Sequence, residues 1–243
     1  WVDYEAAGGT GPDDLSERMD EILSVVEFEE DIFQIGLRRT IDAADQPETV
    51  AKILEARALL QERLSAPDVA SLVESFDEGQ YNANASVAEN ILFGTPIGPT
   101  FAIENLGENA YVLQVLEKME LSKDFLTKGF KLAEMMVEIF HDLPPGHEFF
   151  ERFSFVSSDD LPDFQAMLRR VENTGLDGAG ETDVAMLMAL PFKLVIARHH
   201  LDLIDDAMQE RLLEARRVFA QGLPEDLKPA VQFFDRDAYN AAS

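Results

Sequence analysis

The sequence predicts an all-α or nearly all-α protein, folded as an irregular multi-helix bundle. Apolar residues recur at intervals of three and four along most of the chain, which is the spacing of one helix face. Few segments alternate apolar and polar residues as a half-buried strand does. The 243 residues are 46% hydrophobic and include no cysteine, so the chain can bury a large core without disulfides.

Helical spacing, with proline or glycine at the expected ends, defines a series of predicted helices. Their approximate ranges are 15–26, 32–41, 47–64, 65–76, 86–93, 109–120, 122–140, 160–174, 182–190, 206–222 and 224–234. One apolar run, 192–197, is either a β-strand or the start of a buried helix, because short apolar runs do not separate these two structures.

Capping residues support the helix starts in the first part of the chain. Asp13 or Asp14 is expected to cap the first helix, because a carboxylate can accept from the free amides of a first turn. Pro47 suits a first turn, where its missing amide hydrogen is not needed. Ser65 and Asp68 have the spacing of a capping box, which predicts the short helix that follows.

A clearer capping box is formed by Ser86 and Glu89. The Ser86 hydroxyl can accept from the amide of Glu89, whose carboxylate can reach back to the amide of Ser86. Glycine and proline residues in the segment 94–99 then end this helix.

Similar signals begin the helices of the last part of the chain. Asp160 is followed by proline in the first turn, Thr182 follows a glycine-rich loop, and Asp205 or Asp206 precedes a long amphipathic stretch. We expect each of these residues to cap its helix.

The segment Pro144-Pro145-Gly146 is the best internal boundary. It divides the chain into an N-terminal helical half, 1–146, and a C-terminal helical half, 147–243, which could also pack as one domain. The chain begins with Trp1 and ends without features of a natural terminus, so we expect it to be a piece of a longer protein.

The charge of the chain limits its partners. Forty-seven acidic residues face twenty basic ones, which gives a formal net charge of −27. This charge repels phosphate groups, and no apolar run approaches the roughly 20 residues of a membrane span. We therefore expect no nucleic acid partner and no direct membrane insertion. Acids are densest in 13–31, as either a solvated helix face or a docking surface for a basic patch.

No residue has the spacing of a catalytic or metal site. The four histidines are His141, His147, His199 and His200, and neighbouring helical residues point about 100° apart. His199 and His200 therefore cannot easily share a metal, and polar helix ends explain them better. We predict no catalytic residue and no metal ligand, and a metalloenzyme that uses His199 or His200 is the weakest alternative.

Two distant segments have similar sequences, and we call this similarity the internal echo. Residues 76–86 read FDEGQYNANAS, and residues 234–243 read FDRDAYNAAS, which align with a single gap. Chance similarity in an alanine-rich sequence is one explanation. The other is a duplicated junction, in which the residues after Ser243 in a parent protein repeat those after Ser86.

Residues 86–94, which read SVAENILFG, resemble a stretch of the nucleotide-binding domain of ABC transporters. In that family the stretch follows the Q-loop and begins the helical subdomain, commonly as Thr or Ser, two variable residues and Glu-Asn-Ile. The resemblance implies that Glu78 or Gln80 occupies a Q-loop-like position. It also implies that this chain carries a large helical insertion beside the Q-loop.

The ATP-binding motifs of that family are absent from this sequence. It contains no Gly-Lys pair, so it has no glycine-rich loop followed by the lysine that grips phosphate. The family's Leu-Ser-Gly-Gly-Gln signature is also missing. We therefore expect no cofactor site in this chain, with ATP and magnesium bound only by residues of the parent protein.

Two functional hypotheses follow from these patterns. The first is a non-catalytic insertion or regulatory module of an ABC transporter ATPase subunit, which contacts the transmembrane part, the remainder of its own chain or a partner subunit. This hypothesis implies a cytoplasmic location, at the cytoplasmic face of a membrane. The alternative is a stand-alone acidic helical adaptor that binds a basic or helical protein partner.

Overall fold

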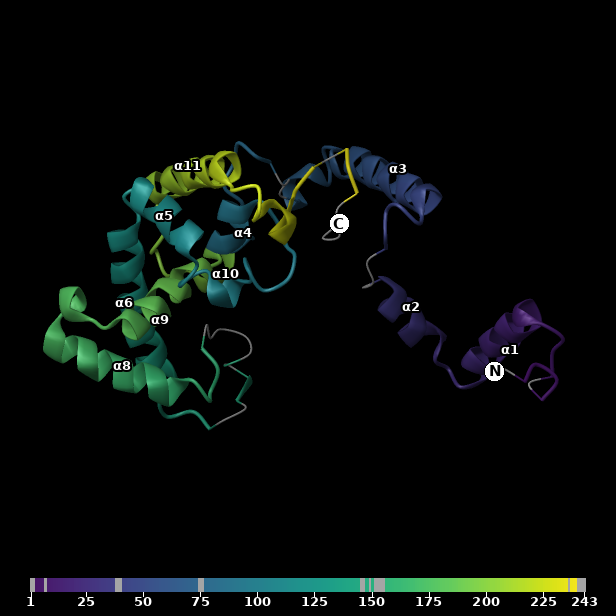
Figure 1. Cartoon of the computed structure of the whole chain (residues 1–243), viewed down its shortest axis with the longest axis horizontal. Helices are drawn as coiled ribbons and strands as arrows, with labels where there is room; N and C mark the ends of the chain where they lie inside the picture. Colours follow the sequence, from purple (N-terminus) through teal and green to yellow (C-terminus); the bar gives the residue numbers. More distant parts are fainter. Residues whose placement is uncertain are drawn as a thin grey trace. The chain divides into compact units, whose positions relative to one another are not determined.

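The computed structural model describes the chain apart from residues 1–2, 7, 38–40, 74–76, 145–146, 149, 151–155, 236 and 240–243. The model is 61% helical, and its described part has ten α-helices and one two-stranded sheet, which confirms the predicted all-α fold (Figure 1). The chain divides into two compact units, Trp1–Ala51 and Lys52–Ser243.

The first unit contains α1 (Pro12–Val25) and α2 (Glu29–Leu37), and α3 (Pro47–Leu64) begins in it and continues into the second unit. None of the residues that the structure describes before position 52 is buried. Large apolar side chains remain exposed instead, including Ile22 and Phe33, which are 56% and 58% exposed. The described residues of this unit therefore form no hydrophobic core.

The second unit packs its helices around a continuous hydrophobic core. Its α-helices are α4 (Val87–Leu92), α5 (Ala110–Lys118), α6 (Ser122–Phe140), α8 (Leu161–Thr174), α9 (Glu181–Phe192), α10 (Ile196–His199) and α11 (Asp206–Gly222). Short 3₁₀ turns are η1 (Ala70–Leu72), η2 (Ile103–Asn105), η3 (Leu176–Gly178) and η4 (Lys228–Ala230). The core takes residues from both sides of the boundary expected at 144–146, of which residues 145–146 lie outside the described part.

The helices α6 and α9 meet backbone to backbone at Gly129. A Cβ atom at this position would lie 2.0 Å from the carbonyl oxygen of Leu187, so only glycine fits without a shift. Pro191, which lies inside α9, has no amide hydrogen to donate to that carbonyl four residues earlier. The close approach of α6 therefore falls where α9 lacks one of its own hydrogen bonds. Beside it, the rings of Phe125 and Phe192 are 5.0 Å apart.

A short antiparallel sheet pairs two segments of the second unit that are far apart in the sequence. β1 (Gly94–Pro96) pairs with β2 (Val231–Phe233), with Gly94 opposite Phe233 and Pro96 opposite Val231. A Cβ atom at Gly94 would lie 2.5 Å from the carbonyl oxygen of Gln232, so glycine is needed for the strands to approach. The sheet holds the segment after α4 against the segment after η4.

Two predictions are wrong, one about the start of α1 and one about the segment that follows α3. Gly11, rather than Asp13 or Asp14, is the N-cap of α1, and the Asp14 carboxylate accepts from the amide and hydroxyl of Thr10 at 2.7 and 2.6 Å. The expected capping box at 65–68 does not form either. The Ser65 hydroxyl donates to the carbonyl of Gln61 at the end of α3, and only the 3₁₀ turn η1 follows in the described residues up to 73.

Three further expectations about the second unit are wrong. Gly180 rather than Thr182 is the N-cap of α9, which continues through Pro191 instead of stopping before it. Asp160 occupies the N-cap of α8, but its carboxylate accepts from the Ser157 hydroxyl rather than from the helix. The range 224–234 forms η4 and β2 instead of a helix, because β1 offers these residues a strand partner.

Other expectations are confirmed. Pro47 begins α3, and Asp205 caps α11 by accepting from the amide of Met208 at 2.8 Å. The run 192–197 is not a strand, since α9 ends within it and α10 begins within it. Only the single bridge between Ser86 and Val195 connects it to another segment in a strand-like manner.

Replacing Gly129 with alanine is expected to lower the free energy of unfolding by about 1–3 kcal/mol, because the new methyl group overlaps the Leu187 carbonyl. Urea titration followed by circular dichroism measures this. Gly36→Ala is the matched control, since a Cβ atom there meets nothing within 4 Å and alanine favours a helix. Equal stability of the two variants would contradict the close packing of α6 on α9.

Candidate functional site

The segment that carries the resemblance is anchored by the predicted capping box. The Ser86 hydroxyl accepts from the Glu89 amide at 3.1 Å, and the Glu89 carboxylate accepts from the Ser86 amide at 2.7 Å. Both interactions were expected from the sequence and are confirmed. The amide of Val87 also donates to the carbonyl of Leu194, which ties the start of α4 to the segment after α9.

Arg216, on α11, is the centre of this site and is only 3% exposed. Its Nε donates to the Asn90 carbonyl at 2.6 Å, and one Nη donates to the Asn90 side-chain oxygen at 3.1 Å. The other Nη donates to the carbonyls of Asp77, Glu78 and Gln80 at 3.2, 2.7 and 3.2 Å. A single buried cation therefore fixes both the turn at 77–80 and the middle of α4.

Asn90 is buried as well, and its side chain is fully used. Its amide nitrogen donates to the carbonyls of Asn82, Ala85 and Ser86 at 2.9, 3.3 and 3.0 Å. Its oxygen accepts from the Asn82 amide at 2.9 Å and from Arg216. These bonds hold the loop before α4 in one conformation, which gives a structural reason for asparagine directly after Glu89.

Phe93 lies at the end of α4 and packs against Arg216. It ends the helix in the left-handed conformation, with φ of 44°, and its ring lies 4.4 Å from the guanidinium carbon of Arg216. A guanidinium over a ring face is attracted by the negative potential of that face. The Phe93 ring also contacts that of Phe234 edge-on at 5.6 Å, so the site continues into the segment after β2.

We call this group of Arg216, Asn90, Phe93 and the turn 77–80 the Arg216 cluster. Glu78 and Gln80, for which the resemblance implies a Q-loop-like position, lie in it, but their carbonyls rather than their side chains contact Arg216. The side chains of Glu78 and Gln80 are both exposed. Phe76, the first residue of the echo, lies outside the described part of the chain.

A groove of about 640 Å³ lies beside the Arg216 cluster and is lined by both segments of the internal echo. Asp77 and Glu78 line it from the first segment, and Asp235, Ala238 and Tyr239 line it from the second. The aromatic side chains of its floor are Phe93, Phe233 and Phe234. The last echo residues, 240–243, lie outside the described residues. We call this the echo groove.

The echo groove is acidic, and burial sets the ionisation of the groups behind it. Burial lowers the pKa of Arg216 to about 10, and the charges of Glu78 and Asp77 act in the opposite direction. Burial raises the pKa of Tyr81 well above its usual range, against the opposing effect of Arg216. Arg216 is therefore charged and Tyr81 neutral near pH 7. The Tyr81 hydroxyl is buried without a hydrogen-bond partner.

The histidines lie apart from the Arg216 cluster and perform local roles. His199 ends α10, and its Nδ1 accepts from the Val195 amide at 2.9 Å. His200 follows in the left-handed conformation, with φ of 46°. His141 is exposed on the turn after α6. In the described residues, no group of three or more His, Asp or Glu side chains could hold a metal ion.

Sequence patterns missed Arg216, although one signal could have found it. The apolar face of α11 contains Met208, Leu212 and Phe219, and Arg216 lies on the same face at helical spacing. A charged residue on an apolar face requires buried acceptors. The acceptors come from residues more than 120 positions earlier, which no local pattern could identify.

Replacing Arg216 with methionine is expected to lower the free energy of unfolding by about 3 kcal/mol, because the buried Asn90 carbonyl and the carbonyls of the turn 77–80 lose their donor. Denaturant titration measures the loss. Lysine at this position should restore only part of it, since an ammonium group cannot reproduce the planar fork of donors. Arg217→Met is the control, because Arg217 is exposed, pairs with Glu214 on the same helix and should change stability by less than about 0.5 kcal/mol when replaced.

The contribution of His199 to stability is expected to fall at acidic pH. Burial, followed by the charge of Arg198, lowers the pKa of His199 below its ordinary value. As the pH falls, the unfolded chain therefore takes up the proton at a higher pH than the folded chain does. The contribution of His199 to stability is complete above a pH of about 6.5 and is lost as the pH falls below that value. The melting-temperature gap between wild type and His199→Gln should thus narrow from pH 7.5 to 5.5. A melting-temperature gap that does not change between these pH values would contradict the lowered pKa of His199.

Comparison of the chain with protein-family models, curated protein sequences and solved structures found no match. None of the helices in the described part combines the length and apolar character that a membrane crossing requires. What the chain does must therefore be inferred from its own residues, of which the Arg216 cluster and the echo groove are the most distinctive.

Proposed function

We propose that the second unit carries a non-catalytic helical module inserted beside the Q-loop of an ABC-type ATPase domain. There it would contact the transmembrane part, the remainder of its own chain or a partner subunit, at the cytoplasmic face of a membrane. One observation carries this proposal. The two segments of the internal echo, separated by about 150 residues, line the same groove next to the SVAENILFG segment.

The chain on either side of this groove is arranged as an insertion requires. The Phe234 amide donates to the Phe93 carbonyl at 2.9 Å, and β1 pairs with β2 directly beyond these residues. The 138 residues between positions 94 and 231, counted inclusively, therefore leave and return at one point. A module whose ends lie together can be inserted into a host loop without disturbing the host fold.

The charges of the site support a role without nucleotide chemistry. Three carboxylates, those of Asp77, Glu78 and Asp235, line the echo groove and would repel a triphosphate. The buried cation behind them, Arg216, is engaged by backbone carbonyls and the Asn90 side chain. ATP and magnesium would therefore be held by the host, and this module would contribute contacts and regulation.

The proposal predicts the sequence of the gene on both sides of this segment. Reading the gene should reveal a Gly-Lys-Ser or Gly-Lys-Thr loop before the segment and a Leu-Ser-Gly-Gly-Gln signature after it. A second Glu-Asn-Ile stretch is expected soon after position 243. Calorimetry on the 243-residue chain should detect no ATP binding at millimolar nucleotide. Flanking sequence without these motifs, or saturable ATP binding by this chain, would contradict the proposal.

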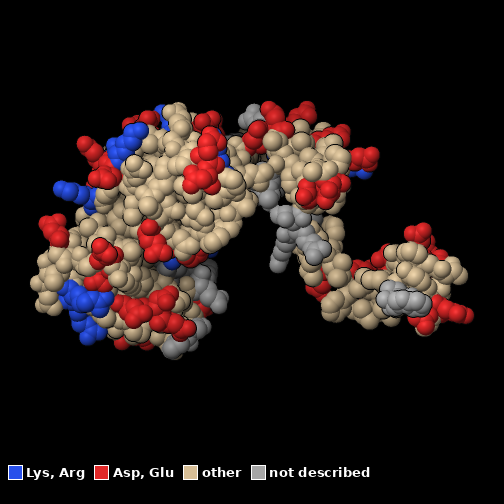
Figure 2. Space-filling model, viewed as in Figure 1, with Lys and Arg blue, Asp and Glu red and all other residues tan. Residues whose placement is uncertain are grey.

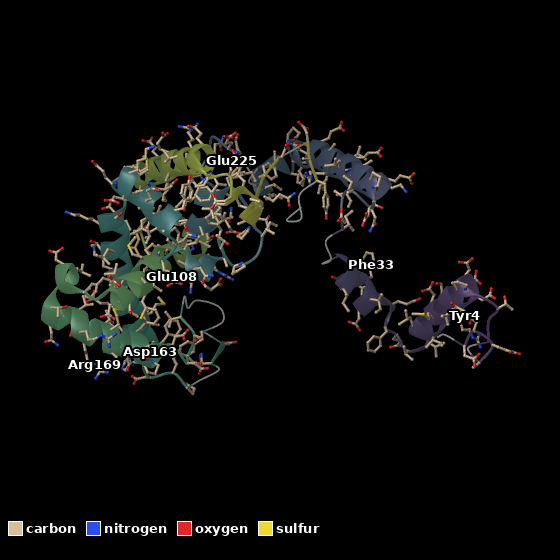
Figure 3. All side chains as sticks on the ribbon, in the orientation of Figure 1. Tyr4, Phe33, Glu108, Asp163, Arg169 and Glu225 are labelled. Carbon is tan, nitrogen blue, oxygen red and sulfur yellow. The ribbon has the colours of Figure 1, made fainter. Side chains whose placement is uncertain are left out.

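A second candidate function is an acidic adaptor for a basic protein partner, and the first unit favours it. Fourteen acidic and three basic residues occur in its 51 positions, and Figure 2 shows red side chains around its helices. Exposed apolar residues on α1 and α2 accompany these acids, including Met19, Ile22 and Phe33, of which Figure 3 labels Phe33. The same gene reading separates the two candidates, since a stand-alone adaptor lacks the flanking ATPase motifs.

A further inference from the structure

A second groove, of about 620 Å³, lies along the helix α9 of the second unit. Along α9 it is lined by residues four apart, in the rows Glu181, Ala185, Ala189, Lys193 and Thr182, Met186, Leu190. Residues at this spacing lie along one face of a helix, so the groove runs parallel to the axis. At 1.5 Å per residue its length is about 18 Å, or three turns of a bound helix. We call it the α9 groove.

Apolar side chains form the floor of the α9 groove. Phe164 of α8 and Leu190 of α9 are almost completely buried beneath it, and the half-buried Met186 supplies apolar surface along α9. Two alanines, Ala185 and Ala189, keep the groove open opposite Gly107, where a Cβ atom would lie 2.7 Å from the Ala185 carbonyl oxygen. Small residues therefore leave space that larger side chains would fill.

Carboxylates form the rim on both walls. Glu104 of η2 and Glu108 just after it form one wall, Asp160 and Asp163 form the other at the start of α8, and Glu181 lies at one end. Figure 3 labels one residue of each wall, Glu108 and Asp163. Glu104, Glu108 and Asp163 are exposed and so remain hydrated in the free protein.

The walls of the α9 groove are held in place before any ligand binds. Arg170 of α8 donates two hydrogen bonds to the buried Asp183 of α9, at 3.0 and 2.5 Å. The Arg170 guanidinium holds the pKa of the Asp183 carboxyl below its usual value, so the pair stays ionised near pH 7. This two-point contact fixes α8 relative to α9, and a preformed groove costs less ordering on binding.

We infer that the α9 groove binds a basic amphipathic helix of a protein partner. An apolar stripe of such a helix would cover Met186, Ala185 and Ala189, and lysine or arginine residues on both sides of the stripe would meet the two acidic walls. The net charge of −27 opposes a second copy of this chain as the occupant. The carboxylate rim opposes a phosphate-bearing ligand in the same way.

This inference adds a binding site to either candidate function, because both require a protein partner, and it does not depend on an ATPase host. The α9 groove shares no lining residue with the echo groove. If the helix does not bind, the test by gene sequence is therefore unaffected. If the gene lacks the ATPase motifs, the helix-binding test is equally unaffected.

The probe is an 18-residue synthetic peptide of lysine and leucine, with its leucines aligned on one helix face. Fluorescence anisotropy measures its affinity for the 243-residue chain. The variant Glu104→Lys/Glu108→Lys should bind it about tenfold more weakly, because two rim charges are reversed. Glu134→Lys/Glu138→Lys is the matched control, since these exposed acids of α6 have the same spacing and the same charge change but lie outside the groove. Its affinity should change less than twofold.

A second pair of variants tests the apolar floor. Met186→Gln should weaken peptide binding several-fold, whereas Met135→Gln, at a half-buried position of α6 outside the groove, should not. Circular dichroism melting checks that each variant is folded. A peptide of the same composition with its leucines dispersed around the helix should bind at least tenfold more weakly than the aligned peptide.

Several outcomes would overturn the inference. Equal losses for the two double-lysine variants, or equal affinity for the aligned and dispersed peptides, would mean that the overall negative charge alone attracts the peptide. Absence of binding at low salt would exclude the site. Spermidine is then added as a competitor of the peptide. If it displaces the peptide and this displacement requires Glu104 and Glu108 but not Met186, the groove is a site for small polycations instead.

Discussion

A buried guanidinium that is satisfied by backbone carbonyls determines the structure around α4. Removing a cation from water costs several kcal/mol unless hydrogen bonds replace its hydration. Arg216 meets this requirement with the Asn90 side chain and with carbonyls from α4 and the turn 77–80. The turn can therefore adopt only a conformation that directs its carbonyls inward. Asn90 then passes the constraint to the loop 82–86, so one charge on α11 orders a segment distant in the sequence.

The residues of the SVAENILFG segment each have a structural role in this unit. Ser86 and Glu89 cap α4, and Asn90 holds the preceding loop. Ile91 and Leu92 are buried in the core, Phe93 lies under Arg216, and Gly94 lets β1 approach β2. The segment thus folds as a stable corner at the point where the chain leaves and returns.

Acidic charge and apolar surface occur together in three parts of the molecule, and two of these, the first unit and the α9 groove, are proposed to meet a partner. The echo groove and the α9 groove both combine carboxylates with an apolar floor, and the helices of the first unit expose acids beside apolar side chains. Charge of one sign attracts a basic partner from a distance and orients it. The apolar surface then supplies binding free energy that salt does not screen. This combination supports the proposed recognition of a basic protein partner.

The sequence by itself determined the helices whose ends depend on neighbouring residues. The capping box of Ser86 and Glu89 and the starts at Pro47 and Asp205 followed from interactions within a few positions. Tertiary structure decided whatever needed a distant partner. The range 224–234 has a helix-like pattern but became η4 and a strand because β1 was available, and the role of Arg216 came from carbonyls more than 120 residues away. Local hydrogen bonds are encoded in short patterns, whereas the pairing of distant groups is fixed only when the chain has packed.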